Sequence, residues 1–579
     1  MKRLIAISLI VLALFIGILS PVVGIGQVVA EDFMVLLPTS AVVLPSNAPV
    51  LDKAVAGLLG LFYGDRIGVC DGVTDNDTIY KAAVASHQVS LREGAFNFNS
   101  ASNLYLPEKT VLSGAGTNLT FFTCNETRYI ILKYNDIEIR DLTLVGGFGV
   151  QKVDSNGGGI YRVNNLGSAS ISTTAYAFGV MGVVDNFQHE DVRVINHCGT
   201  GFINSGTISN YSNINGFVTG SGRYSRYNDW VVGVDIIESG SLTNAYYVNV
   251  RSEYNWESGF HSEEAPIKTN VNLVSCVGDF NGLKPNSLFG SGYVLFGNIN
   301  AIDCSGSYNA RKAFDCMGVG GSLVRPTGIG STYGAHIVMA SKWTINNPLV
   351  HDCAIGFYFI TGSTKNTVVN PIVYSCLVNI YFNGSNFNNI VGGQASLAGQ
   401  YNLQFEYSND NVVDMLMVSE ASQTTNNTYS NVRIGYGCSR NTISVVARKG
   451  NLPNQPKYGV DIVSGSSWDN RILDSDLTNS GLLGVINDNG TNTVVIDTAG
   501  YITEISGQAS IQSGTTFTTV THGLPFTPNL KDFTITPLSL LGNASYSYPS
   551  NATSTTFRIN LNVDPVTTNV TVAWGYTRK

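Results

Sequence analysis

A loosely repeated phrase in the middle of the chain constrains the fold more than any other feature of the sequence. A short alternating stretch that ends in a polar residue or a cysteine recurs at residues 248–253, 271–276, 299–304, 347–353 and 370–376. The first three copies begin 23 and 28 residues apart, and the last two begin 23 residues apart. A second phrase, with an aromatic residue at Phe202, Phe260, Phe357 and Tyr381, follows at similar intervals. Periods in this range indicate a stack of similar structural units.

The local pattern within each repeat indicates which kind of stack this is. Each unit holds two or three alternating runs of about five residues separated by Gly, Asn or Ser, and none resembles an amphipathic helix. Helical repeats are therefore excluded, and the regular leucines of leucine-rich repeats are missing. A coil of short parallel strands, a β-helix, remains. With one coil every ~4.8 Å, about 14 to 17 coils between residues 110 and 500 would form a rod of roughly 65–80 Å.

The cysteines follow the same repeat. There are nine, and no CxxC pair suggests a zinc site. Cys276 is expected beside Cys304, and Cys353 beside Cys376, each one coil apart. Stacked Cα atoms ~4.8 Å apart would permit a disulfide, but a buried ladder of free thiols is the favoured interpretation.

Composition narrows the class of partner. Only 13% of residues are charged, the formal net charge is −8, and no basic stripe is present, so nucleic acid is not an expected partner. The chain holds 61 Gly, 28 Tyr and 26 Phe, which suits short strands and many turns.

The N-terminus carries an export pattern. Lys2 and Arg3 precede an apolar run over residues 4–19, and a stretch of small residues ends at Ala30. This order predicts a signal peptide at residues 1–30, with an uncleaved membrane anchor as the alternative. Residues 31–62 are interpreted as an apolar leader or linker.

A family resemblance begins after this leader. The DGVTDNDT stretch at residues 71–78, the segment 79–84 after it, and the phrases at residues 89–96 and 104–116 resemble the opening of pectate-lyase-superfamily β-helices, including phage tailspikes. Asn76 stands where an aspartate is usual, and the pair at 92–93 departs from the usual proline-containing turn. The resemblance implies an all-β fold: a right-handed parallel β-helix over residues 63–500 with a short N-terminal capping helix.

The last part of the chain changes character. Residues 505–579 read as alternating strands, from the TVTHGL phrase at 519–524 to the run 570–576. They resemble the small C-terminal β-sandwich of tail-fibre and surface β-helix proteins. In such proteins this module serves trimerisation or ligand binding. The resemblance to tailspikes implies a homotrimer. His522 is expected to be a turn residue and not a metal ligand.

The richest polar cluster lies at residues 254–264. If Phe260 points inward, strand alternation places its neighbours on the outer face, where paired carboxyl groups suit glycoside hydrolysis. Partners from neighbouring coils would come from Asp235, Asp279 or Asp303. The candidate catalytic residues are Glu257, His261, Glu263 and Asp279, and the candidate substrate-binding residues are Tyr254, Trp256 and Arg311.

Several functions stay open on this sequence. The favoured one is a secreted or virion-displayed carbohydrate-active protein that hydrolyses an extracellular polysaccharide, with no metal or other cofactor. A lyase is the variant within the enzyme class, and it would need a cation such as Arg311, Lys312 or Ca²⁺ against a uronate. The alternatives are a non-catalytic glycan-binding adhesin and a structural surface component, because outward charged residues such as Glu264 are often merely solvated.

Overall fold

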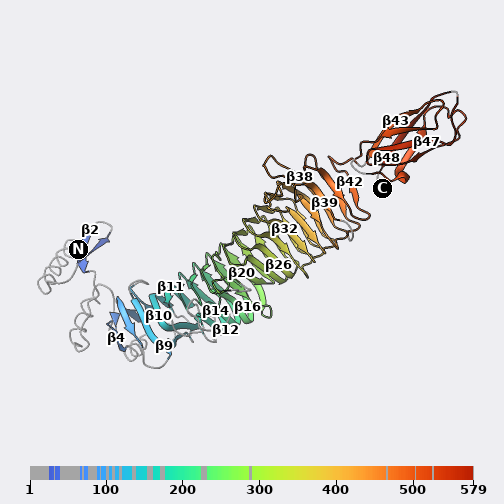
Figure 1. Ribbon diagram of the computed structural model, residues 1–579. Helices are drawn as coiled ribbons and strands as arrows, with labels where there is room; N and C mark the ends of the chain where they lie inside the picture. The colour runs from blue at the N-terminus through green and yellow to red at the C-terminus, as the bar shows by residue number, and fades with distance from the viewer. Residues whose placement is uncertain are drawn as a thin grey trace.

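The structure of the protein is a computed structural model. It describes residues 25–30, 33–38, 66–67, 71–75, 88–91, 93–98, 103–106, 111–115, 120–132, 138–152, 161–169, 176–197, 199–222, 231–285, 290–463, 467–502, 504–524, 527–566 and 568–577. These residues form an elongated coil of short parallel strands, with a separate group of strands beyond its C-terminal end (Figure 1). The predicted right-handed parallel β-helix is confirmed.

Three parallel sheets run along the coil, and each turn of the chain typically adds one strand to each sheet. Sheet 1 contains β7 (Leu104–Leu106), β9 (Thr120–Leu132), β10 (Glu138–Lys152), β12 (Tyr176–Glu190), β14 (Thr200–Ile214), β16 (Val234–Val248), β18 (Phe260–Ser262), β20 (Ser291–Phe296), β23 (Lys312–Val319), β26 (Tyr333–Ser341), β29 (Ile355–Phe359), β32 (Val378–Asn383), β35 (Leu403–Glu406), β37 (Val432–Ile434), β39 (Tyr458–Ile462) and β41 (Gly484–Asp488).

The longest strands continue from one sheet into the next. Sheet 2 takes in parts of β10, β12, β14 and β16, with β3 (Arg66–Ile67), β5 (Gln88–Leu91), β8 (Val111–Ser113), β11 (Tyr161–Ala169), β19 (Ile267–Val274), β21 (Ile299–Ile302), β24 (Ser322–Val324), β27 (Thr344–Asn346), β30 (Thr367–Val369), β33 (Asn389–Val391), β36 (Val412–Ser419), β38 (Thr442–Arg448), β40 (Arg471–Leu473) and β42 (Val494–Ile496). Sheet 3 takes in parts of β9, β10, β11, β36 and β38, with β4 (Asp71–Asp75), β6 (Gly94–Asn97), β13 (Arg193–Ile195), β15 (Phe217–Thr219), β17 (Arg251–Glu253), β22 (Ser305–Ser307), β25 (Thr327–Ile329), β28 (Leu349–His351), β31 (Ile372–Tyr374) and β34 (Gln394–Ser396).

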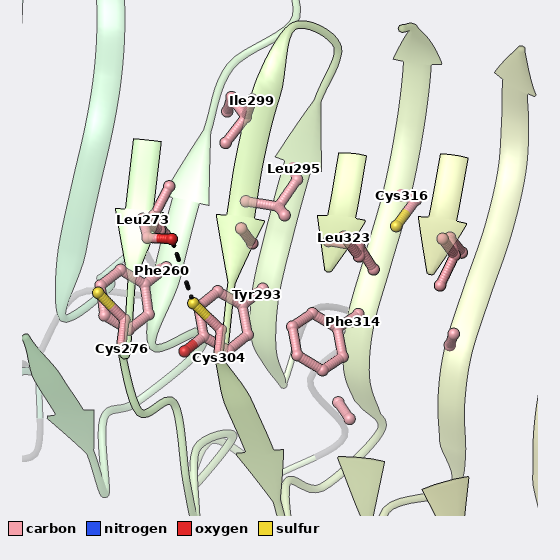
Figure 2. Packing of buried hydrophobic residues seen from close by; sticks show 14 of the residues in the cluster. Phe260, Leu273, Cys276, Tyr293, Leu295, Ile299, Cys304, Phe314, Cys316 and Leu323 are labelled. Carbon is pink, nitrogen blue, oxygen red and sulfur yellow. Dashed lines mark hydrogen bonds between the residues drawn. The ribbon is translucent and has the colours of Figure 1, made fainter. Parts of the chain in front are cut away.

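The interior of the coil is filled by ladders of like residues. Phe260, Tyr293 and Phe314 are registered partners on successive strands, and their rings stack at 4.8 and 4.7 Å (Figure 2). Cys276 and Cys304 lie side by side in the same core. The six cysteines whose side chains the structure describes are all buried and free, which confirms the predicted thiol ladder.

Buried asparagines order one corner of each coil. Five asparagines stack between Asn366 and Asn470, and each of the first four donates its Nδ2 to the Oδ1 of the next, at 2.9–3.2 Å. Each of these four Oδ1 acceptors also accepts the backbone N–H of the preceding asparagine. The ladder therefore satisfies main-chain donors at a turn that water does not reach.

The C-terminal strands form two antiparallel sheets. One has the order β43 (Glu504–Ile511), β48 (Val570–Thr577) and β45 (Phe533–Pro537); the other has the order β44 (Phe517–Thr521), β47 (Thr556–Leu561) and β46 (Ser547–Ser550). They share a core around Phe557, which packs on Phe533 and Trp574. His522 is buried there and accepts the Leu524 N–H at 3.0 Å, as a turn residue does.

The N-terminal expectations are partly outside the described residues. This holds for the predicted capping helix at 79–84 and for most of the predicted signal peptide. Asp71–Asp75, expected as a turn, forms strand β4 and pairs with β6. β1 (Ile25–Ala30) pairs antiparallel with β2 (Phe33–Pro38), across the predicted boundary at Ala30. The described part of the chain contains no helix long and apolar enough to cross a membrane.

Candidate functional site

A single row of outward positions on sheet 1 gathers most of the reactive side chains. The position after each inward residue in the series that contains Phe260, Tyr293 and Phe314 is in register from coil to coil, about 4.8 Å apart. We call this series the outward row. Its members, in order, are Asp235, His261, Val294, Asp315, His336, Tyr358, Tyr381, Gln404 and Arg433.

The first two members of the row, Asp235 and His261, lie among three glutamates that are not part of it. We call these five residues the acidic cluster: Asp235, Glu238, Glu257, His261 and Glu263. The imidazole Nδ1 of His261 lies 3.8 Å from an Asp235 oxygen and 3.9 Å from a Glu263 oxygen. His261 and Asp235 are almost covered, whereas the Glu263 side chain is 46% exposed. Phe260, just before His261, is fully buried in the core, as predicted, but His261 and Ser262 are also buried, so burial does not alternate along this strand.

The neighbouring carboxylates raise the pKa values of two members of this cluster, Glu238 and His261. Burial raises the pKa of Glu238, and the charges of Asp235 and Glu263 raise it further, against a hydroxyl of Ser205 that lowers it. Burial lowers the pKa of His261, but Asp235, Glu263 and Glu257 together outweigh burial and raise it above its usual value. The cluster thus favours one protonated carboxyl group and a charged imidazole.

Glu257 is held at the edge of this cluster. Its Oε1 accepts from Lys284 Nζ at 2.9 Å, and the side chain is 5% exposed. Its Oε2 is buried with no hydrogen-bond partner in the described part of the chain. Lys284 is placed by its backbone N–H, which donates to the carbonyl of Trp256. The carboxylate is therefore neutralised by one lysine and retains an unused oxygen.

Other predicted residues lie elsewhere. Asp279 sits at the level of sheet 3, where it accepts the Ser307 N–H at 2.7 Å, and burial raises its pKa. Tyr254 stacks on Phe280 at 4.9 Å at the next corner. The structure thus brings Glu257, His261 and Glu263 together and leaves Asp279 and Tyr254 in a different environment.

Two further candidate binding residues and one candidate partner have distinct surroundings. Trp256 is half-buried and packs over Gly222, where a Cβ would lie 2.6 Å from it. Arg311 directly precedes Lys312, and its backbone N–H donates to Gly290. Asp303 is an exposed residue paired with Arg325 at 2.6 Å. Of these, only Trp256 adjoins a member of the acidic cluster along the chain.

Two coils further along, the row contains a buried network that we call the central network: Lys312, Asp315 and His336. Asp315 is 1% exposed and accepts hydrogen bonds from Lys312 Nζ and, at 2.7 Å, from His336 Nδ1. The rings of Tyr333 and Tyr358 lie 5.3 and 5.6 Å from the His336 ring. A buried carboxylate is thus compensated from two sides.

The far part of the row is polar without being acidic. Arg433 donates to Glu406 at 3.1 Å and to the Tyr401 hydroxyl at 2.8 Å. Tyr381 stacks on Tyr358 at 5.2 Å, and burial raises the pKa of Tyr381 to about 12. Among the described residues, no three His, Cys, Asp or Glu side chains are grouped so that they could hold a metal ion.

The comparisons with known proteins concern the fold. The chain is similar to the A-module of the mannuronan C-5 epimerase AlgE4 of Azotobacter vinelandii, with 14% identity, a TM-score of 0.30, and coverage of 74% of this chain and 94% of that one. It is similar to the tailspike gp49 of Pseudomonas phage LKA1, with 11% identity, a TM-score of 0.33, and coverage of 86% and 91%. No protein-family model and no curated protein matches the chain. Likeness this distant identifies no substrate, and the β-helix rests on the strand register itself.

The sequence pointed to Lys312 of the central network as a candidate cation but gave no prediction for Asp315, His336 or Glu238. A signal for Asp315 was present, because it follows Phe314 as His261 follows Phe260. His336 follows Ala335, which carries no aromatic marker, so only the register reveals its position. Glu238 enters the cluster because β16 is irregular between Asp235 and Ile237, a shift that no repeat pattern predicts.

Proposed function

We propose that the protein binds a polysaccharide along the outward row of sheet 1 and hydrolyses glycosidic bonds at the acidic cluster, outside the cell or at a cell or virion surface. One observation carries this proposal. On one face of the β-helix, Asp235 and Glu263 lie beside a single imidazole, that of His261, and raise the pKa of the neighbouring Glu238. Glycoside hydrolysis needs a protonated carboxyl group beside an ionised one.

The roles follow from charge and exposure. Glu238 is the general acid, because its pKa is raised by burial and by two carboxylates. Glu263, the more exposed partner, is the carboxylate that activates water or attacks the sugar. His261 contacts both Asp235 and Glu263, and its protonated ring offsets the repulsion between these two carboxylates. Glu257 adds negative charge behind the imidazole.

The charge balance favours hydrolysis of a neutral sugar over uronate elimination. A lyase needs a cation to neutralise the sugar carboxylate. Three cations along the row are already paired with acids: Lys284 with Glu257, Lys312 with Asp315, and Arg433 with Glu406. At the acidic cluster, Asp235 and Glu263 carry two negative charges against the single positive charge of a protonated His261, so a carboxylated sugar would meet net negative charge from these three groups.

A binding-only adhesin is the second candidate, and one observation favours it. Beyond the acidic cluster the row continues through Tyr358, Tyr381, Gln404 and Arg433. These groups can hydrogen-bond a glycan over several coils without a pair of free carboxylates. An inactive protein that keeps this part of the row would hold a glycan without cleaving it.

The test is cleavage of a panel of neutral and acidic polysaccharides by the full chain. New reducing ends and absorbance from unsaturated products are followed together. We expect reducing ends without absorbance, and a loss of about 10²–10⁴-fold in Glu238→Gln and Glu263→Gln. Glu264→Gln is the matched control, since this neighbouring carboxylate is exposed and lies outside the cluster.

Each other outcome contradicts the proposal in its own way. Absorbance from unsaturated products would show a lyase. Glycan binding with no cleavage across the panel would show an adhesin. An equal loss in Glu264→Gln would show that the assay reports surface charge and not the acidic cluster.

A further inference from the structure

The central network has the geometry of an oriented base. Asp315 is buried, and its Oδ1 lies 2.7 Å from His336 Nδ1. Lys312 Nζ binds the other carboxylate oxygen, so the carboxylate cannot rotate without breaking one of two charge-assisted contacts. Asp315 therefore fixes both the ring orientation and the tautomer of His336.

The tautomer determines what His336 can do. Because Nδ1–H donates to the carboxylate, the lone pair of the neutral ring lies on Nε2. The side chain is 10% exposed and packs beside the rings of Tyr333 and Tyr358, which also stack on each other at 5.4 Å. When Nε2 takes a proton, the adjacent carboxylate of Asp315 stabilises the imidazolium that forms.

A hydrogen-bond donor stands beside this base. The hydroxyl oxygen of Tyr358 accepts from Asn383 Nδ2 at 3.1 Å, which leaves its own hydrogen to donate elsewhere. Tyr358 also stacks against Tyr381, so its ring position is fixed from a second side. The site thus places the ring of an O–H donor, held on two sides, 5.6 Å from the ring of an oriented base.

We propose that this network is a second active site, which hydrolyses O-acyl esters carried by the polysaccharide. His336 takes a proton from water as the water oxygen attacks the acyl carbonyl carbon. The Tyr358 O–H donates to the oxyanion that develops. The bond between the acyl carbon and the sugar oxygen then breaks, and His336 returns the proton to that oxygen. The products are a carboxylic acid and a free sugar hydroxyl.

Charge separates this site from the acidic cluster. Lys312 and Asp315 cancel each other, so with a neutral imidazole the network carries no net charge. It offers no second carboxylate for glycoside hydrolysis and no uncompensated cation for a uronate. A neutral ester is the substituent that such a base and donor can process. The inference rests on the proposed function only in taking a polysaccharide as the carrier of the ester.

The test measures ester hydrolysis by the full chain. Acetate release from acetylated xylan and hydrolysis of 4-nitrophenyl acetate are followed, together with new reducing ends. We expect a loss of at least about 100-fold in His336→Ala and about 10- to 100-fold in Tyr358→Phe. Asp315→Asn tests positioning, and it should lower kcat with little change in KM and alter the pH profile.

The matched control is His351→Ala. His351 is also a histidine bonded through Nδ1 to an aspartate, Asp352 at 2.8 Å, but it lies on sheet 3, stacked on Tyr374. Because any surface imidazole hydrolyses activated esters slowly, this variant sets the background. Equal rates for His336→Ala and His351→Ala, or no ester hydrolysis by the unaltered protein, would overturn the inference.

The two proposals fail separately. Acetate release without new reducing ends would uphold the central network and refute glycoside cleavage at the acidic cluster. Reducing ends without acetate release from acetylated xylan or hydrolysis of 4-nitrophenyl acetate would do the reverse.

Discussion

The asparagine ladder predicts an unusually large effect from one polar substitution. Asn388 is 1% exposed, and its side chain makes four hydrogen bonds. Its Oδ1 accepts from the backbone and side chain of Asn366, and its Nδ2 donates to Ser363 and Asn411. Asn388→Ala removes all four contacts in a corner that water does not reach. We expect this change to open the surrounding coils.

The magnitude follows from which groups lose every partner. Without Asn388 Oδ1, the backbone N–H of Asn366 has no acceptor, which costs about 1–3 kcal/mol. The other three groups each retain one partner: Asn366 Nδ2 bonds to Ala340, Ser363 O to the Asn386 N–H, and Asn411 Oδ1 to the Asn388 N–H. Their lost bonds contribute about 0.5–1.5 kcal/mol each. The total is about 2.5–7.5 kcal/mol.

Hydrogen exchange is the suitable assay, because a stacked coil opens locally and need not unfold as one unit. Amides of residues 363–411 should exchange at least about 100-fold faster in Asn388→Ala. The control is Asn389→Ala: this neighbour has a buried Oδ1 with no hydrogen-bond partner, so its loss should change stability by less than about 0.5 kcal/mol. Similar exchange in both variants would refute the reasoning.

Four further predictions concern the pH dependence of cleavage, the pH dependence of stability, packing and the thiols. Cleavage should fall as pH rises through the raised pKa of Glu238, since the general acid must be protonated; a pH–rate profile that rises there would contradict this role. Because the pKa of His261 is higher in the folded than in the unfolded protein, its protonation stabilises the fold below the unfolded-state pKa, and this stability is lost as pH rises through the folded-state pKa. His261→Gln should therefore lower Tm more at about pH 5 than at about pH 9. Phe382→Ala, which removes a ring stacked between two phenylalanines, should cost about 3–5 kcal/mol in urea unfolding. Cys276 and Cys304 should resist iodoacetamide in the folded protein and react only after denaturation, as mass spectrometry would show.

Much of the fold could be predicted from the sequence. The repeat spacing predicts parallel coils, and Phe260 and its counterparts point inward as the alternation requires. The same spacing predicts that Cys276 lies beside Cys304. These predictions succeed because, in a β-helix, residues that repeat in the sequence at intervals of one coil lie side by side in space. A repeated local pattern therefore predicts which residues are neighbours.

The candidate site was only partly legible. Alternation places His261 and Glu263 on one outward face, because it depends on a single strand. The environment of Asp279 depends on the corner between two sheets, which no alternation describes. Whether an outward residue is solvated or covered also depends on what packs over it. His261 is covered and Glu264 is exposed, although they are only three residues apart.

The sequence by itself determined the coil, its inward ladders and the segment that carries the acidic cluster. Only the tertiary structure decided which acids and bases meet, because the coils are unequal: Tyr293 follows its partner Phe260 by 33 residues, and Phe314 follows Tyr293 by 21. Insertions of this size shift the register unpredictably, and a one-residue slip turns a side chain to the opposite face. Asp315 and His336, 21 residues apart, share a hydrogen bond because the folded coils bring them into register.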